Sequence, residues 1–180
     1  MPYKALLLDR DGIVNVDRGY VGDIGRFTFL DGVFTLARHA VDRGFRVVVV
    51  TNQSGIARGY FTEAAFLELS DWMRGMFLDQ GVELAGIFHC PYHRSGVVER
   101  YARDSFWRKP NPGMILDAAR RLNLSLSRSV FLGDQPTDME AARAAGVERR
   151  VLLCSEDDPI RQEAATSTIR RHTDLIASLL

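Results

Sequence analysis

Short apolar runs alternate with longer amphipathic stretches along most of this 180-residue chain. The apolar runs contain many β-branched residues and show no strict alternation with polar positions, which is typical of strands covered on both faces. Five segments fit this description and are predicted to be strands: residues 3–8, 45–50, 85–90, 129–132 and 149–154.

The segments between these predicted strands have the spacing of helices. They are residues 32–44, 62–81, 112–123 and 136–146, and three of them end on a glycine, which favours a helix C-terminus. Thr62 is expected to cap the second helix. This strand–helix alternation predicts an α/β fold, a three-layer Rossmann-like sandwich with a central parallel sheet. We expect one domain over residues 1–180, with no large cap domain.

Three segments depart from the alternation. Residues 10–31, after the first strand, are predicted to form a flap, and residues 91–111 form a long polar loop. The tail over residues 155–173 is polar, and the last seven residues predict a short docking helix. His39 and His172 are expected to lie at the surface of helices.

Composition narrows the range of partners. Basic and acidic residues balance at 23 each, so the chain has no net positive charge that would favour binding to nucleic acid or to an anionic membrane. Two cysteines are too few for a disulfide framework. The apolar run near the N-terminus is too short for a signal peptide. We therefore expect a cytoplasmic monomer with a small-molecule substrate and neither nucleic acid nor membrane as a partner.

Polar side chains follow three of the predicted strands. Asp9 and Asp11 end the first, residues 51–54 end the second, and Asp134 ends the fourth, while Lys109 lies in the long loop. Ligands of open parallel sheets bind beyond the carboxyl ends of the strands, so these groups should converge on one crevice.

Converging carboxylates repel one another unless a cation lies among them, and hard oxygen ligands favour Mg²⁺. A metal, a lysine and a threonine hydroxyl around one carboxylate form a site for phosphoryl transfer. Asp9 is then the expected nucleophile, through an aspartyl-phosphate, and Asp11 the general acid and base. Thr51 and Lys109 complete the expected catalytic group.

Four motifs in order along the chain resemble those of the haloacid dehalogenase phosphatase superfamily. They are DRDG (9–12), TNQSG (51–55), RKPNPGM (108–114) and GDQPTDMEAA (133–142). The segments DGIVNVDRGYV (11–21), TNQSGIARG (51–59) and CPYH (90–93) resemble the heptose 1,7-bisphosphate 7-phosphatases, close relatives of the histidinol-phosphatases. The resemblance covers residues 3–154.

The resemblance implies a role for each matching position. Mg²⁺ would be held by Asp9, the backbone carbonyl of Asp11, and Asp134, while Thr51 and Lys109 would stabilise the phosphoryl group. The implied reaction removes the 7-phosphate of D-glycero-D-manno-heptose 1,7-bisphosphate. Substrate contacts are implied for two segments and two single residues: Asp17, Arg18, Gly19 and Tyr20 in the flap, Asn52, Gln53 and Ser54 after strand two, Arg108, and Gln135.

Several interpretations remain open at this point. Gln135 stands where many of the heptose enzymes carry lysine or serine, so its substrate contact is in question. Asp138 is either a first-turn acid of its helix or part of the site, and Arg58 either binds a phosphate or is exposed. Another small phosphomonoester, such as histidinol phosphate, is the alternative substrate. A receiver-type phospho-acceptor domain is the alternative of another class, although such domains carry the acceptor aspartate after strand three, where this chain has Cys90 and Pro91.

Zinc is not expected. The zinc-bearing members of the family hold the long loop with four ligands, and the corresponding positions here are Cys90, Tyr92, Ser105 and Trp107. One thiolate cannot replace the four N or S ligands of a structural zinc site. We expect instead that aromatic side chains pack together to hold the loop: Tyr92, Tyr101, Phe106 and Trp107.

Overall fold

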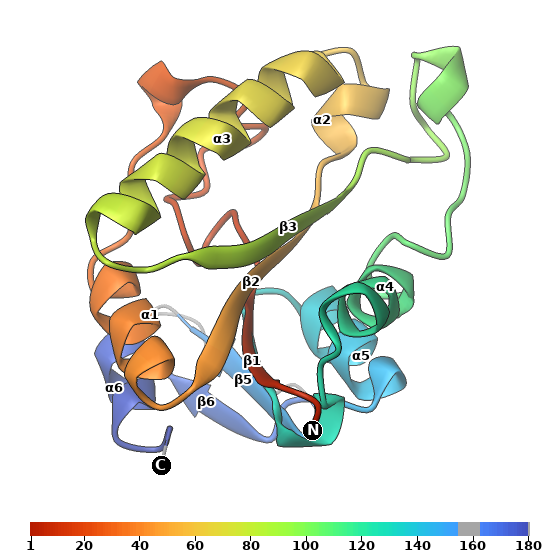
Figure 1. Ribbon diagram of the computed structural model, residues 1–180. Helices are drawn as coiled ribbons and strands as arrows, with labels where there is room; N and C mark the ends of the chain where they lie inside the picture. Colours follow the sequence, from red (N-terminus) through yellow and green to blue (C-terminus); the bar gives the residue numbers. More distant parts are fainter. Residues whose placement is uncertain (155–162, 180) are drawn as a thin grey trace.

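The computed structural model describes residues 1–154 and 163–179. Its centre is a six-stranded sheet in the order β3-β2-β1-β4-β5-β6, in which every neighbouring pair is parallel (Figure 1). The strands are β1 (Lys4–Leu8), β2 (Phe45–Asn52), β3 (Leu84–Cys90), β4 (Val130–Gly133), β5 (Arg149–Leu153) and β6 (Ser167–Ile169). The predicted parallel α/β sandwich is confirmed.

Helices cover both faces of the sheet (Figure 1). One face packs against α1 (Val33–Asp42), α3 (Glu63–Asp79) and α6 (His172–Ile176), and the other packs against α4 (Gly113–Leu122) and α5 (Pro136–Ala145). A short α2 (Ser54–Ala57) follows β2, and the described residues also contain three 3₁₀ helices: η1 (Ile24–Arg26), η2 (Glu99–Tyr101) and η3 (Leu126–Arg128).

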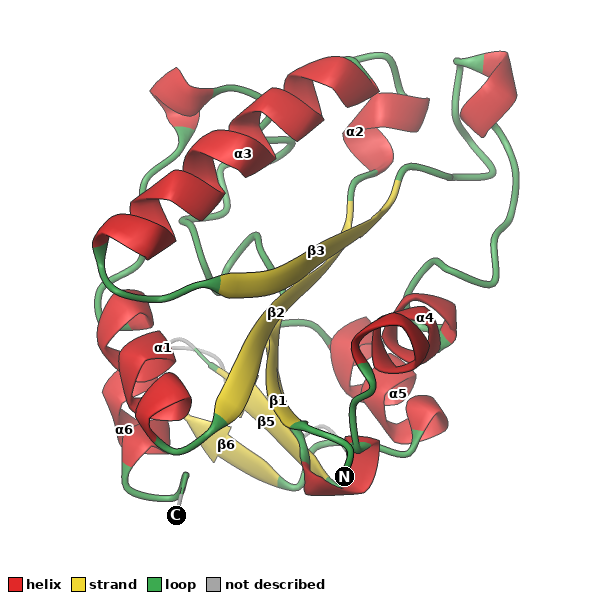
Figure 2. Cartoon of the chain, viewed as in Figure 1, coloured by secondary structure: helices red, strands yellow, loops and turns green. Residues whose placement is uncertain are grey.

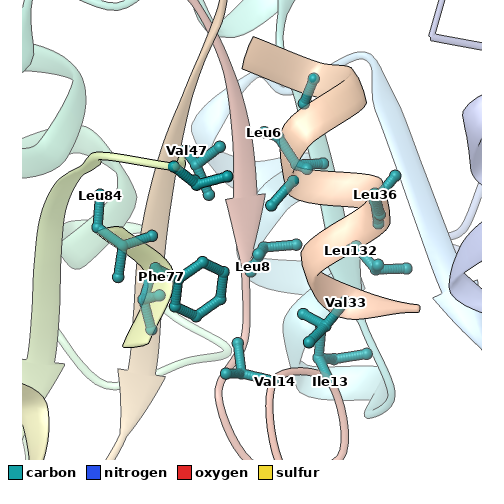
Figure 3. Close-up of a cluster of buried hydrophobic side chains, with 14 of the residues drawn as sticks. Leu6, Leu8, Ile13, Val14, Val33, Leu36, Val47, Phe77, Leu84 and Leu132 are labelled. Atoms are coloured by element: carbon teal, nitrogen blue, oxygen red, sulfur yellow. The ribbon is translucent and has the colours of Figure 1, made fainter. Parts of the chain in front are cut away.

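Side chains of β1 alternate between two apolar cores, as the pleat of a strand requires. Leu6 and Leu8 face the helices α1 and α3, where they meet Val33 and Phe77 (Figure 3). Leu7 points to the opposite face, into the core beneath α4 and α5. Burial on both faces explains why the strands read as continuous apolar runs in the sequence.

Local signals place the helix ends close to the expected positions. Thr62 caps α3, and its hydroxyl accepts a hydrogen bond from the backbone N–H of Ala65 at 3.1 Å. Gly146 ends α5 in the left-handed conformation. Pro112 is the N-cap of α4, so this helix begins one residue later, at Gly113.

The C-terminal region differs from the prediction. Residues 167–169 add a sixth strand that the sequence did not indicate, within the segment 155–173 that was predicted to be a polar tail. Residues 155–162 of that tail lie outside the described residues. The prediction that His172 lies at the surface is wrong. The residue is buried, and its Nε2 lies 2.7 Å from the carbonyl oxygen of Ile13. Packing of α6 beside α1 encloses the imidazole, and a hydrogen bond over 159 residues of sequence compensates its burial.

Two long segments lie beyond the carboxyl ends of the strands (Figure 2). The predicted flap after β1 contains η1, and the long loop after β3 contains η2. No helix of the described residues combines the length and the apolar character that crossing a bilayer requires.

Candidate active site

Residues from four parts of the chain line one cavity of about 400 Å³ at the carboxyl ends of the strands. β1 leads to Asp9 and Asp11, β2 leads to residues 52–55, and β4 leads to Asp134. The remaining lining residues come from the flap, the long loop and the start of α5: Asp17, Gly19, Tyr20, Arg108, Lys109, Gln135, Thr137 and Asp138. The expected convergence therefore occurs, except that Arg18 and Thr51 do not line the cavity.

Lys109 is the centre of the charged group. Its side chain is almost fully buried, and its ammonium lies 2.9 Å from Oδ1 of Asp9 and 2.6 Å from Oδ1 of Asp138. It also donates to the carbonyl oxygen of Val50 at 2.9 Å. Both carboxylates raise the pKa of Lys109 against the opposing effect of burial, so the lysine is a permanent cation.

Asp138 has both of the roles that the sequence left open: it is a first-turn acid of α5 and it is part of the site. Its Oδ2 accepts from the backbone N–H of Gln135 at 3.1 Å, which is the capping box at the start of α5. Its other oxygen pairs with Lys109. One buried carboxylate thus joins the helix terminus to the cavity.

Carboxylate oxygens of Asp9, Asp134 and Asp138 lie within 4.8 Å of one another. Burial and then the charge of Asp138 raise the pKa of Asp9 to about 8, and the same two causes raise the pKa of Asp134 to about 6. Oδ1 of Asp134 is buried without a hydrogen-bond partner among the described residues. Three crowded carboxylates with one orphaned oxygen fit a hard divalent cation, because its charge would let them ionise together.

Gly12 allows the β1 loop to approach this cluster. Its φ of +81° is in the left-handed region, and a Cβ at this position would lie 2.2 Å from Oδ2 of Asp134. Any side chain there would be strained and would also displace Asp134. The glycine of the DRDG motif is therefore required by both backbone conformation and space.

Asp11 accepts hydrogen bonds from three side chains. Nη2 of Arg10 lies 2.8 and 2.9 Å from its two oxygens, Nδ2 of Asn15 donates at 3.0 Å, and Nε2 of Gln53 donates at 2.9 Å. This acceptor-only arrangement matches an ionised carboxylate. Arg10 is 1% exposed and packs over the ring of Phe66 at 5.6 Å.

Asn52 and Gln53 organise the cavity through their side-chain amides. Asn52 exchanges two hydrogen bonds with the backbone of Lys109, at 3.0 and 3.1 Å, and so ties the end of β2 to the long loop. Nε2 of Gln53 also donates to Oγ1 of Thr51 at 2.9 Å. Because that oxygen accepts, the buried Thr51 hydroxyl keeps its own proton for another acceptor.

The flap and the long loop supply the remaining expected residues. Asp17 accepts from the backbone N–H of Gly19 at 2.8 Å, and Tyr20 adopts a left-handed φ of 51°. Arg26 donates to the carbonyl oxygens of Arg18, Gly19 and Tyr20, which places the Arg18 backbone in the flap and leaves its side chain outside the cavity.

Sequence reasoning did not single out two functional candidates, Arg10 and Thr137. Thr137 lines the cavity in the first turn of α5. The available signal for Arg10 was its place between two aspartates at the end of a buried strand. A charged residue at that point must either reach solvent or find a partner, and Arg10 pairs with Asp11 and the carbonyl oxygen of Val21.

The anchoring of the long loop differs from the expected aromatic cluster. Tyr92 and Tyr101 have ring centroids 6.0 Å apart, and Trp107 packs against the core beneath α4 and α5. Phe106 is 61% exposed and does not join them. Tyr101 packs in a small apolar cluster with Ile56 and Phe66, and polar contacts add to this anchor. The Tyr101 hydroxyl donates to Glu63 at 2.6 Å, and the other oxygen of Glu63 lies 2.8 Å from Nε2 of His89.

Comparison with known proteins identifies the family. Residues 106–179 match the HAD-hydrolase-like family model. The chain is 45% identical over 179 residues to the D-glycero-α-D-manno-heptose-1,7-bisphosphate 7-phosphatase of Burkholderia mallei, covering 99% of this chain and 95% of that protein. It is 48% identical over 160 residues to the D-glycero-β-D-manno-heptose-1,7-bisphosphate 7-phosphatase of Escherichia coli K12, with coverages of 89% and 83%.

A solved structure agrees with these relatives. The D,D-heptose 1,7-bisphosphate phosphatase of B. bronchiseptica, complexed with magnesium and phosphate, superposes with a TM-score of 0.83 at 28% identity and covers 98% of this chain and 97% of that one. Sequence identity over nearly the whole chain and the shared fold confirm the resemblance predicted from the four motifs. The chain belongs to the haloacid dehalogenase superfamily of hydrolases, within the family of the heptose 1,7-bisphosphate 7-phosphatases.

Proposed function

We propose that this protein is a Mg²⁺-dependent phosphomonoesterase that removes the 7-phosphate of D-glycero-D-manno-heptose 1,7-bisphosphate through an aspartyl-phosphate on Asp9. The observation that carries the proposal is the cluster of Asp9, Asp134 and Asp138 around Lys109, in a cavity of about 400 Å³. Relatives that are 45% and 48% identical bear the name of this activity.

The nucleophile is the carboxylate of Asp9. One of its oxygens attacks phosphorus, the bond between phosphorus and the sugar oxygen breaks, and the leaving oxygen takes a proton from Asp11. Water then attacks the aspartyl-phosphate and gives its proton to the Asp11 carboxylate, which releases inorganic phosphate and restores Asp9. Lys109 lies beside Asp9 and offsets charge in both steps.

Asp9, Asp134 and the backbone carbonyl of Asp11 are the groups that would hold Mg²⁺. When bound, the ion neutralises part of the charge of the carboxylates and of the phosphoryl oxygens. Asp138 supports the site from the other side of Lys109, through the ion pair at 2.6 Å. Thr51 does not line the cavity, and we propose that its hydroxyl, whose oxygen accepts from Gln53, donates its proton to the phosphoryl group when substrate binds.

The acceptor-only arrangement of Asp11 suits the second step. Arg10, Asn15 and Gln53 all donate to its carboxylate, as the base that activates water requires. In the first step the protonated carboxyl must turn at least one oxygen from these donors toward the leaving group. We propose that Arg10 and Gln53 position Asp11 between these two orientations.

Arg108 is proposed to bind the second phosphate of the substrate. It lines the cavity next to Lys109, whose charge is already shared between two aspartates. Asp17, Gly19, Tyr20, Asn52, Gln53, Ser54 and Gln135 are the remaining candidates for substrate contacts. We further propose that the enzyme acts as a cytoplasmic monomer on this small sugar phosphate.

A panel of phosphomonoesters tests the proposal. Phosphate release would be measured from the α and β anomers of heptose 1,7-bisphosphate, from histidinol phosphate and from a simple aryl phosphate, with Mg²⁺ and with chelator. We expect the highest kcat/KM for one heptose bisphosphate anomer and no turnover in chelator. A higher kcat/KM for histidinol phosphate would assign the alternative substrate, and full activity in chelator would contradict the metal dependence.

A further inference from the structure

Arg58 lies beside the cavity and has no part in the chemistry described above. It directly follows α2, whose residues Ser54 and Gly55 line the cavity. The side chain is half-buried, with its guanidinium carbon 5.9 Å from the ring centroid of Tyr20, a lining residue. Its Nη2 lies 3.4 Å from Nε2 of His93, and its Nε is buried without a hydrogen-bond partner among the described residues.

A second arginine in the same region also lacks a partner for part of its guanidinium. Nη1 of Arg108 is buried without a hydrogen bond, and neither Arg58 nor Arg108 forms an ion pair with a carboxylate of the part of the chain described. Burial lowers the pKa of Arg108, and the positive charge of Arg58 acts in the same direction. Burial, followed by the charges of Arg108 and Arg58, also lowers the pKa of His93. Both arginines also border Tyr20, whose ring centroid lies 5.9 Å from the Arg58 guanidinium carbon and which lines the cavity together with Arg108.

Two half-buried positive charges with unused hydrogen-bond donors lower the stability of the fold unless an anion lies between them. No carboxylate among the described residues that line the cavity forms an ion pair with either arginine. Asp9 and Asp138 pair with Lys109, and Asp11 pairs with Arg10. Asp134 accepts from the amide of Gln135 at 2.9 Å, and Asp17 accepts from the backbone N–H of Gly19. Arg108 is the one cation among the described lining residues that forms no ion pair.

We infer that Arg58 and Arg108 together form the subsite for the second anionic group of a bisphosphate substrate, and that Arg58 determines the preference for bisphosphates over monophosphates. Two guanidiniums offer up to ten N–H donors in planar forks, the geometry that phosphate oxygens accept best. The inference rests on the proposed function. It assigns Arg58, which contacts the lining residue Tyr20 without itself lining the cavity, to substrate selection.

Two ligands that differ only in the second phosphate test the inference: heptose 1,7-bisphosphate and heptose 7-phosphate. Affinity for each would be measured by calorimetry in an Asp9→Asn background, which prevents turnover, with and without Arg58→Gln. We expect Arg58→Gln to raise Kd for the bisphosphate about tenfold, equivalent to ~1.4 kcal/mol, and to change Kd for the monophosphate by less than about twofold. Arg58→Lys should restore part of the affinity, because it keeps the charge and loses the fork.

Arg94→Gln is the matched control, because Arg94 is an exposed arginine next to His93 in the same loop. It should leave both affinities unchanged. An equal loss for the two ligands on Arg58→Gln would show that Arg58 only supports Tyr20 and His93, and an unchanged Kd for the bisphosphate would also overturn the inference. These binding results are independent of catalysis, so a wild-type protein without phosphatase activity would contradict the proposed function and leave the subsite to be decided by the Kd values.

Discussion

At the scale of single residues, the chemistry depends on how Asp9 and Lys109 share a buried environment. Their side chains are 2.9 Å apart, and Asp134 and Asp138 add two further carboxylates within 4.8 Å of Asp9. One lysine cannot balance three carboxylates. Burial and then the neighbouring negative charge raise the pKa of Asp9, and the excess negative charge explains the need for a divalent cation.

Asp9→Asn tests the nucleophile. The amide cannot form the aspartyl-phosphate, so we expect kcat to fall by about 10⁴-fold or more. The change also removes one of three repelling carboxylates, so Tm in chelator should stay the same or rise. Asp79→Asn, an exposed aspartate at the end of α3, is the control and should alter neither quantity. A substantial kcat in Asp9→Asn would rule out the covalent route.

The raised pKa of Asp9 also predicts a pH dependence of stability without metal. Between the ordinary value of 3.8 and the folded value of about 8, the folded protein binds more protons on this group than the unfolded chain does. The contribution of Asp9 to stability therefore falls as pH rises through that range. In chelator, the Tm of Asp9→Asn relative to wild type should increase from pH 5.5 to pH 7.5.

Mg²⁺ should remove that difference at pH 7.5, because the cation lets Asp9 ionise beside its neighbours. Thermal unfolding followed by circular dichroism, with chelator and with Mg²⁺, measures all four combinations. A Tm difference that does not vary with pH in chelator would show that Asp9 is already ionised in the metal-free protein.

At the scale of elements, the long loop after β3 is held by a polar connection in addition to the apolar packing of Tyr101. Glu63, at the first position of α3, accepts from Tyr101 of η2 and lies beside His89 of β3. Backbone N–H groups of Val97 and Val98 also donate to the carbonyl oxygen of Ala57. The loop that ends in Arg108 and Lys109 is thus attached to both α2 and α3.

Tyr101→Phe should loosen this loop. Removing the hydroxyl takes away the hydrogen bond of 2.6 Å to Glu63 and leaves the ring in place. A hydrogen bond to a charged group contributes about 1.5–3 kcal/mol, so we expect faster proteolysis within residues 91–107 and a higher KM. Tyr92→Phe is the control, because the Tyr92 hydroxyl makes no hydrogen bond within the described residues. Equal proteolysis rates for wild type and Tyr101→Phe would contradict this anchor.

The same loop is expected to hold no zinc. Cys90 is buried, its Sγ lies 4.0 Å from the carbonyl oxygen of Tyr92, and Ser105 and Trp107 supply no thiolate. One thiolate with a histidine cannot provide the binding free energy of about 10–16 kcal/mol that four-ligand zinc sites reach. Elemental analysis of the purified protein should find less than stoichiometric zinc. One equivalent of zinc that disappears in Cys90→Ala would show that the loop has a metal ligand set after all.

At the scale of the whole molecule, the C-terminal helix α6 is joined to the flap at the other end of the chain. The contact is the hydrogen bond of 2.7 Å between Nε2 of His172 and the carbonyl oxygen of Ile13. Since the flap also supplies cavity residues, the fold connects its last helix to the region around Asp11 and Asn15. The C-terminal region therefore takes part in positioning the flap.

His172→Asn should lower the free energy of unfolding by about 2 kcal/mol, because a buried carbonyl oxygen loses its donor. Burial lowers the pKa of His172 below its ordinary value of 6.5. The imidazole is therefore neutral when folded, and its contribution to stability is present above pH 6.5 and is lost as pH falls below that value. Urea unfolding at pH 7.5 and pH 5.5 should show a smaller difference between wild type and His172→Asn at the lower pH. His39→Asn serves as the control.

Much of the fold and most of the candidate site could be predicted from local pattern. Strands buried on both faces leave a continuous apolar signal, and parallel strands must bring their carboxyl ends to one edge, so Asp9, Asn52 and Asp134 could be placed together without coordinates. Glycine and threonine signals located helix ends because they act within a few residues. β6 escaped prediction because three residues at the edge of a sheet, two of them exposed, carry no apolar pattern.

Only the tertiary structure decided which polar groups are buried and what they pair with. His172 was predicted to lie at the surface, the role of Asp138 remained open, and Arg10 received no assignment, because residues of these types are seldom fully buried. Their partners lie on other elements or become available only after chain segments dock: Asp138 meets Lys109 across the cavity, and His172 meets Ile13 across the molecule. The cost of burying a charge depends on such distant partners, and a single sequence without coordinates does not contain those distances.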